Sequence, residues 1–458
     1  MAAESTEVKN DFSKGRVSSA ILRMAIPLTI AQMVAVLYNL VDRMYIGRLT
    51  DSRAFAGLGL ALPAVMIVSA FSNLYGGGGA PLCSIERGRG DLARAKRIQG
   101  NAFALLAGTG LLLTVLGLVF TRPILFLLGA SEDTYPFAAA YLRIYLLGNV
   151  FVMISQGMNS FINSQGFSRI GMTTVLIGAL LNLVLDPVFI FVLDMGVRGA
   201  ALATVFSQAV SAAWVLLFLC GKRVILRLEM RDLKLDGKIV GRILGLGVTG
   251  FIMMGTNALV SAVGNNQLRR FGGDLYVGVM TALTTIHEVV VMVVQGVTHG
   301  AQPVLGYNYG AGRGDRVAQG VRFIAIVSVC YALLVWALLM LLPGAVIRVF
   351  VHDAALVEAG RNAVRLYFCA FPFLSLQFAG QSTFVGLGHA KQAMFFSLLR
   401  KVFIVTVLMY LLPGLFGLGA AGVYLAEPIS NVIGGLACFL TMYFTVYRRL
   451  KSSGPAAA

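Results

Sequence analysis

Long apolar runs recur along the whole chain, and they constrain its fold more than any other feature. A helix needs roughly 20 mainly apolar residues to cross a bilayer. The purest runs of this kind are Phe103–Phe120, Val175–Leu193, Ala200–Leu219, Phe323–Leu342 and Val402–Leu418. We expect twelve transmembrane helices, beginning near residues 24, 54, 98, 136, 170, 199, 240, 275, 320, 362, 395 and 419.

The composition excludes a soluble protein and supports an all-α integral membrane fold. Hydrophobic residues make up 58% of the chain and charged residues only 12%, against roughly 25% charged residues in a typical soluble domain. Such a chain has too few polar residues to cover a water-exposed surface, whereas lipid tails cover apolar side chains in a membrane.

An internal repeat of about 220 residues divides the chain into two similar halves. Gly-Arg-Gly-Asp occurs at 88–91 and again at 312–315, and Gly-Ala-Ala occurs at 199–201 and again at 419–421. Because each half contains six helices, both insert in the same orientation, and we expect a pseudo-twofold axis along the membrane normal. The expected order is a cytoplasmic segment (1–20), an N-lobe of six spans (21–220), a solvated cytoplasmic linker (221–238), a C-lobe of six spans (239–447) and a cytoplasmic tail (448–458).

The basic charge is distributed unevenly between alternate loops. With both termini in the cytoplasm, 26 of the 37 Lys and Arg residues fall on the inner side and 11 on the outer side. This bias follows the positive-inside rule, so we assign the net charge of +17 to topology and to contact with anionic lipid heads rather than to nucleic acid. No apolar region with a cleavage site follows the polar first twenty residues, so we expect no removable signal peptide.

Motifs for metal, nucleotide or covalent chemistry are missing from the sequence. The five cysteines are scattered without metal or disulfide spacing, and no phosphate-binding loop is present. His287-Glu288 resembles the start of a zinc-protease motif, but position 291 is Val. We therefore expect no metal, no cofactor and no enzymatic activity. Two parallel lobes indicate a transporter, and an ion gradient is its natural energy source.

The first span carries an acid at a depth that is costly in a membrane and hence indicates function. Tyr38 and Asn39 precede Asp42 by four and three residues, so the three share one helix face. Pro27 removes a backbone donor near the start of this span, and we expect a bend there. The alternative is that Asp42 lies at the membrane interface and pairs with Arg43.

The fifth span carries a second acid beside a proline. Asn182 and Asp186 are one turn apart, and Pro187 frees a backbone carbonyl one turn back. A carboxylate, an amide oxygen and a free carbonyl together suit a proton or a hard cation. Thr204 and Gln208 of the sixth span offer further oxygen ligands. The alternatives are that Asp186 only caps a broken helix and that Thr204 bonds to its own helix.

Further polar residues are candidates for lining a substrate cavity. Gln156, Asn159 and Asn163 form an amide stripe on the fourth span, with hydrogen bonding between helices as the alternative. The second half contributes Glu288, Gln295 and Gln302 of the eighth span and Glu427 of the twelfth. The deepest ionised groups in this interpretation are all acids, while the bases lie in loops. An acidic cavity favours organic cations.

Several segments together resemble the multidrug and toxic compound extrusion (MATE) family, and its bacterial MepA-like branch in particular. They are Pro27–Gly47 with its Tyr-Asn-Leu-Val-Asp, Asn182–Phe191, Gly196–Thr204 and Gln302–Ala311. The resemblance covers about residues 20–447. It implies export of drugs coupled to entry of Na⁺ or H⁺, and it implies a cation-coupling site of Asp42, Asn182, Asp186 and Thr204 in the N-lobe. Some members instead use C-lobe acids in the seventh and tenth spans, where this chain has Asn257, Gln267, Gln377 and Gln381.

The sequence therefore predicts a cation-coupled antiporter of the bacterial inner membrane. We expect Asp42 and Asp186 to lie close together, so that binding H⁺ or Na⁺ neutralises the pair, changes the first span and releases a cationic drug or dye outside. We expect a monomer with both termini cytoplasmic. Two alternatives remain: a flippase for lipid-linked oligosaccharides, which would need bases in its cavity, and a membrane enzyme.

Overall fold

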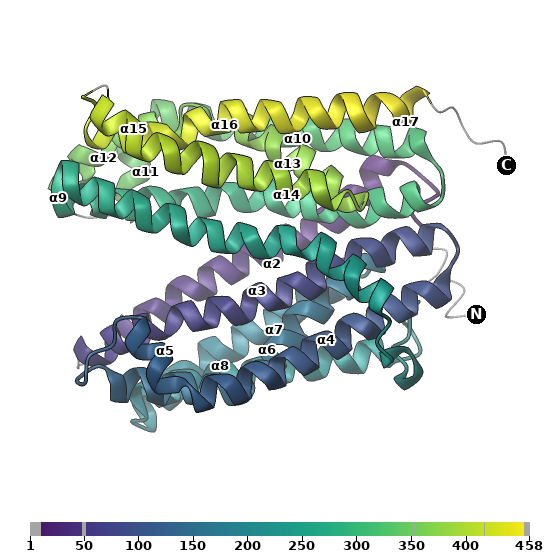
Figure 1. Ribbon diagram of the computed structural model, residues 1–458, viewed down its shortest axis with the longest axis horizontal. Coiled ribbons are helices and arrows are strands. Elements are labelled where there is room, and N and C mark those ends of the chain that lie inside the picture. The colour runs from purple at the N-terminus through teal and green to yellow at the C-terminus, as the bar shows by residue number, and fades with distance from the viewer. Residues whose placement is uncertain (1–10, 48–51, 351–352, 416, 453–458) are drawn as a thin grey trace. The chain divides into compact units, whose positions relative to one another are not determined.

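The computed structural model describes residues 11–47, 52–350, 353–415 and 417–452, and these form helices joined by short loops, without a β-strand. This confirms the predicted all-α fold (Figure 1). The helices are α2 (Val17–Gly47), α3 (Ser52–Gly88), α4 (Leu92–Val119), α5 (Thr121–Leu127), α6 (Tyr135–Ser164), α7 (Ser168–Pro187), η1 (Val188–Val192), α8 (Gly196–Leu219), η2 (Met230–Leu233), α9 (Gly237–Gly310), α10 (Gly314–Leu341), α11 (Pro343–Phe350), α12 (Ala354–Phe368), α13 (Phe371–Gly386), α14 (Ala390–Leu398), η3 (Leu399–Thr406), α15 (Val407–Leu415), α16 (Ala420–Met442), η4 (Tyr443–Tyr447) and α17 (Arg448–Ser452).

The described residues contain eleven helices that are long and apolar enough to cross a membrane, and α12 with α13 provides a twelfth span bent by 46°. The helix α9 holds two of these spans, because Gly273 takes φ 74° and ψ −170° and so breaks the helical path. Each predicted starting point lies within about two helical turns of an observed one. The chain is a multi-pass membrane protein.

The chain divides into two compact units. Ile30–Phe251 form the first unit, and Phe12–Thr29 together with the residues from Ile252 onward form the second. Both boundaries lie inside helices, in α2 and in α9. The helix α2 continues through Pro27, and the bend expected there stays a prediction.

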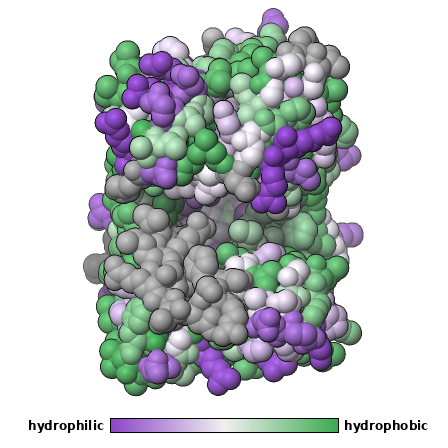
Figure 2. Space-filling view, turned by 90° about the vertical axis from the view of Figure 1, so that its left-hand side faces the viewer, coloured by the Kyte–Doolittle hydropathy of each residue, from purple (hydrophilic) through white to green (hydrophobic). Residues whose placement is uncertain are grey.

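In the first unit, α6 is the most buried span and packs against α3, α4 and α8. Close approach of α3 and α6 depends on two glycines, since a Cβ atom at Gly76 would lie 2.6 Å from the carbonyl oxygen of Gly157. The outer face of α4 instead exposes Leu111, Val115 and Val119. Exposed side chains of this kind suit contact with lipid rather than water. Figure 2 shows one end of the helices, where hydrophilic residues gather in separate groups among apolar ones.

The predicted linker carries mostly exposed charged side chains, as expected of a solvated connector, but its backbone is also bound to the first unit. The side chain of Leu226 is fully buried. Its backbone N–H donates to Gln165 Oε1 at 2.7 Å, and its carbonyl accepts from Gln99 Nε2 at 3.2 Å. Gln165 Nε2 donates in turn to Gln99 Oε1 at 3.2 Å, and Asn101 bonds to backbone groups further along the linker. Charge alone indicated solvation, but these amides satisfy the buried backbone.

Replacing Gln165 by leucine should destabilise this contact. The change leaves the buried N–H of Leu226 without its acceptor, at a cost of about 1–3 kcal/mol. We expect a lower thermal unfolding temperature in detergent and faster tryptic cleavage after Arg227. Gln156→Leu is the matched control, because Gln156 is exposed on α6. Equal unfolding temperatures and cleavage rates for both variants would show that the linker is not held this way.

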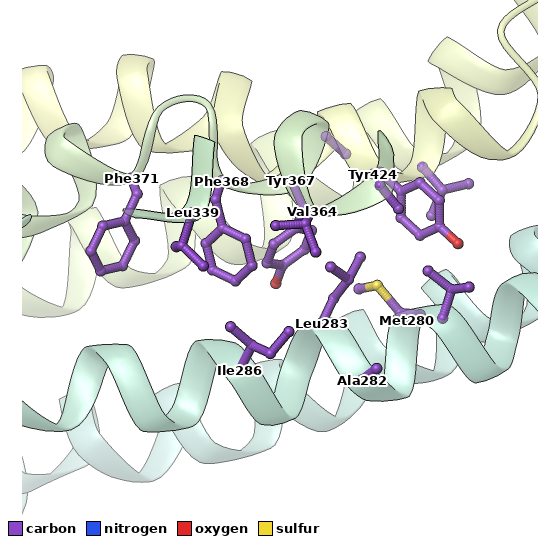
Figure 3. Packing of buried hydrophobic residues seen from close by; sticks show 14 of the residues in the cluster. Met280, Ala282, Leu283, Ile286, Leu339, Val364, Tyr367, Phe368, Phe371 and Tyr424 are labelled. Atoms are coloured by element: carbon purple, nitrogen blue, oxygen red, sulfur yellow. The ribbon is translucent and has the colours of Figure 1, made fainter. Parts of the chain in front are cut away.

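The second unit contains two apolar clusters. In one of them, Tyr367, Phe368 and Phe371 point toward Leu283 and Ile286 of α9 (Figure 3). These aromatic side chains bring the bent pair α12–α13 against the second span of α9.

The other cluster joins the two ends of the described chain. It contains Phe12 and the first turns of α2, and Leu450 of α17 packs against it. Arg316 Nη2 and Asn308 Nδ2 both donate to the Phe12 carbonyl, at 3.0 and 3.2 Å. Both ends therefore lie at one end of the second unit, as an even number of spans requires.

Candidate functional site

A buried polar cluster joins α7 and α8 in the first unit. Asn182 and Asp186 lie one turn apart on α7, and each is 1% exposed. Asn182 Nδ2 donates to Asp186 Oδ1 at 3.2 Å and to Thr204 Oγ1 at 3.4 Å. Thr204 also donates to the carbonyl of Ala200 in its own helix, at 3.0 Å. The structure thus brings together three of the four residues proposed to couple transport to a cation.

The local sequence disrupts the regular helix beside this cluster. Pro187 has no backbone N–H and cannot bond to the carbonyl one turn earlier. The chain continues as the π-helix η1, in which the N–H of Leu193 donates to the carbonyl of Val188 at 2.9 Å. Single π-helical turns inside α-helices occur frequently at functional sites. Asp186 therefore precedes an irregular turn instead of a uniform helix.

The oxygen atoms of the cluster suit a small cation. Asn182 Oδ1 is buried and accepts no hydrogen bond from the residues that the structure describes. The same amide group bonds through Nδ2 to the Asp186 carboxylate and the Thr204 hydroxyl, and carboxylate, amide and hydroxyl oxygens are ligands of hard cations. A buried carboxylate within a span also marks ion and proton pathways in membrane proteins. Over the described ranges, no group of three His, Cys, Asp or Glu side chains is placed to hold a metal ion.

The fourth residue, Asp42, lies on α2, but its side chain and that of Asn39 are outside the described part of the structure. Tyr38, one turn before Asp42, is half-buried. The approach of Asp42 to Asp186 therefore stays a prediction.

The amide stripe of α6 contacts a neighbouring helix. Asn159 Nδ2 donates to the carbonyl of Gly171 in α7 at 3.2 Å, and Asn163 Oδ1 lies against the same glycine. Asn159 thus follows the alternative left open by the sequence, hydrogen bonding between helices, whereas Asn163 Oδ1 accepts no hydrogen bond from a described residue. Gln156 differs from them, since it is exposed. Gln208 of α8 accepts from Ser155 Oγ at 2.5 Å.

The second unit holds a buried base and a largely buried one within a span, which corrects the prediction that all bases lie in loops. Arg400 and Lys401 lie in η3, inside the span Ala390–Gly414. Arg400 Nη1 donates to Glu427 Oε1 at 2.8 Å, and Lys401 Nζ donates to the same oxygen at 3.0 Å. Arg400 Nη1 also donates to Asn431 Oδ1 at 2.8 Å. Glu427 is thus paired with two bases, so it does not make its surroundings acidic.

The other candidates of the second half lie on α9. Glu288 is exposed, and Gln295 and Gln302 are half-buried. Gln302 lies at a close contact of α9 with α13, where a Cβ atom at Gly386 would be 3.4 Å from the Gln302 backbone. Of the two acids predicted to line the cavity in the second half, Glu427 is paired with bases and Glu288 is exposed within a span.

Comparison with known proteins decides the family. The MatE family model matches residues 27–188 and then, a second time, residues 249–411. The chain belongs to the MatE family. The two matches in this MatE member begin 222 residues apart, in agreement with the repeat found in the sequence. The predicted resemblance is confirmed.

Relatives and solved structures agree with this assignment over nearly the whole chain. Multidrug export protein MepA from Staphylococcus saprophyticus is 25% identical over 436 residues, which cover 94% of this MatE chain and 95% of the relative. MepA from Staphylococcus aureus is also 25% identical, over 439 residues. A MOP superfamily transporter from Pyrococcus furiosus has the same fold, with a TM-score of 0.90, 23% identity and coverage of 96% and 98% of the two chains.

Proposed function

We propose that this chain is an antiporter that exports organic cations, such as cationic drugs or dyes, in exchange for H⁺ or Na⁺. The buried Asn182–Asp186–Thr204 cluster carries the proposal, because it offers a carboxylate and neutral oxygens to a small cation inside a span. The relatives named multidrug export protein MepA support drug export as the direction of transport.

In the proposed cycle, the charge of the cluster determines to which side of the membrane the drug-binding site is open. Binding of H⁺ or Na⁺ at Asp186, together with Asp42, neutralises the site from outside and lowers the affinity for the drug. The ion then leaves inward as the two units alternate their access. A ligand shifts such an equilibrium only by its different affinity for the two states, and neutralising a buried carboxylate supplies that difference.

The proposed location is the bacterial inner membrane, with both termini in the cytoplasm and a monomeric protein in contact with lipids. The excess of basic residues on the inner side supports this topology, and it persists after Arg400 and Lys401 are removed from the loop count.

Imposed gradients should identify the coupling ion. In proteoliposomes loaded with a fluorescent cation, we expect an inward gradient of one ion, applied alone, to drive export of the dye. The gradients of pH and of Na⁺ are applied separately, with a K⁺ gradient as control. If neither the pH gradient nor the Na⁺ gradient changes the rate of dye export, coupling to these cations is ruled out.

A flippase for a lipid-linked oligosaccharide is the second candidate, and the buried Arg400 and the largely buried Lys401 favour it. A pyrophosphate carries at least two negative charges, however, and Glu427 leaves the cluster of three side chains with a formal charge of only one. The same proteoliposomes, supplied with a fluorescent lipid-linked oligosaccharide, separate the two functions.

A further inference from the structure

A second polar site lies in the second unit, apart from the cluster on α7 and α8. Five polar side chains line a small pocket there, and they are Gln377, Gln381, Ser397, Arg400 and Lys401. They come from α13, α14 and η3, and the remaining wall is apolar. The pocket has room for one functional group rather than for a whole drug.

The charges around this pocket do not cancel. Arg400 and Lys401 both donate to the single oxygen Oε1 of Glu427, at 2.8 and 3.0 Å. Two cations thus share one anion, and the cluster carries a formal charge of +1. Both bases are inside a membrane span, with their side chains 8% and 12% exposed. Excess charge at such depth is costly, and residues that carry it usually serve a function.

Two donors that line the pocket have no acceptor in the structure. Arg400 Nε and Ser397 Oγ are buried and make no hydrogen bond to any described residue. A guanidinium presents its donors in a planar fork that matches the two oxygens of a carboxylate. Arg400 Nε, Ser397 Oγ and Lys401 Nζ are therefore available to one anionic oxygen group.

We propose that this pocket binds a singly charged carboxylate group of an organic molecule. One negative charge balances the excess of +1, whereas a phosphate ester with two negative charges would leave the occupied pocket with a net negative charge. Apolar side chains on the pocket wall, among them Phe378 and Met253, suit the carbon skeleton attached to the carboxylate. The inference concerns binding alone and does not depend on the coupling ion.

A matched pair of dyes tests this proposal on the full chain in detergent. Tetramethylrhodamine carries a free carboxylate, and its methyl ester differs only by masking that group. Binding of each dye is measured by fluorescence polarisation. We expect Lys401→Gln to weaken binding of the carboxylate dye by roughly tenfold or more, as for loss of one charge-assisted hydrogen bond, and to leave the ester unchanged.

Lys401→Arg is the control, because it keeps the charge and should keep most of the affinity for the carboxylate dye. If Lys401→Gln binds both dyes as the unaltered protein does, the proposal is overturned. A loss of affinity for both dyes to the same extent would also contradict it, since that would indicate a structural role.

Competition in the unaltered protein provides a test that needs no variant. We expect sodium benzoate to displace the carboxylate dye, whereas neutral benzamide does not. Sodium chloride at the same concentration distinguishes an organic carboxylate from a small inorganic anion. If chloride displaces the dye as well as benzoate does, the site belongs to inorganic anions and the proposal fails.

Discussion

Asp186→Asn should abolish coupled efflux while the protein stays folded and inserted. Asparagine has nearly the same shape and still bonds to Asn182, but it neither takes up a proton nor offers a negative charge to Na⁺. Losing a charged partner in a buried site costs about 1.5–3 kcal/mol, or roughly tenfold or more in affinity for the ion. Because asparagine also cannot alternate between a charged and a neutral form, efflux of a fluorescent cation from proteoliposomes should fall to the level of empty liposomes.

Asp133→Asn is the control for this experiment, because it makes the same chemical change at an exposed position. It should transport as the unaltered protein does. Thermal unfolding and gel filtration establish that Asp186→Asn is folded. Undiminished, gradient-dependent efflux in Asp186→Asn would remove the cluster on α7 and α8 from the mechanism.

Glu427→Leu should give a large loss of stability. The change leaves Arg400 and Lys401 side by side in a membrane span without their shared carboxylate. Removing one partner of a buried ion pair costs about 3–5 kcal/mol, because the remaining charge is uncompensated. We expect a marked fall in the thermal unfolding temperature in detergent, and reduced amounts of protein in the membrane.

A double variant separates the charge effect from a loss of packing. Glu427→Leu combined with Lys401→Leu removes one cation together with the anion, so part of the lost stability should return. Glu288→Gln serves as the control for removing an acid from a span, since Glu288 is exposed. If the double variant is less stable than Glu427→Leu alone, the electrostatic explanation is wrong.

The sequence was sufficient to predict the spans and the polar cluster of the first unit. Apolar runs of fixed length identify the spans because the bilayer sets their length. Asn182 and Asp186 were grouped by their spacing of one turn, which a helix preserves. Thr204 was a candidate oxygen ligand from its residue type, and the family resemblance then assigned it to the same site, since no local rule connects residues on different helices. Contact between α7 and α8 then brings the three together.

Two features could not be predicted from the sequence, and the physical reason is the same for both. Arg400 and Lys401 were counted as loop residues because the purest apolar run begins at Val402, although a span starting near 395 already includes them. The charge on the linker likewise indicated solvation, yet Gln99 and Gln165 bind its backbone around Leu226. In both cases a polar residue is satisfied by a partner far away in the chain, and such partners leave no periodic signal.

The boundaries of the two units have a mechanical consequence. The chain passes from one unit to the other within α2, after Thr29, and within α9, after Phe251. A continuous helix resists torsion and stretching far more than a loop does, because its backbone hydrogen bonds act together. In the proposed cycle, a movement of one unit against the other would therefore have to bend α2 and α9. Pro27, which lacks a backbone donor, lies beside one of these points, and we expect α2 to bend there more easily than a helix without proline.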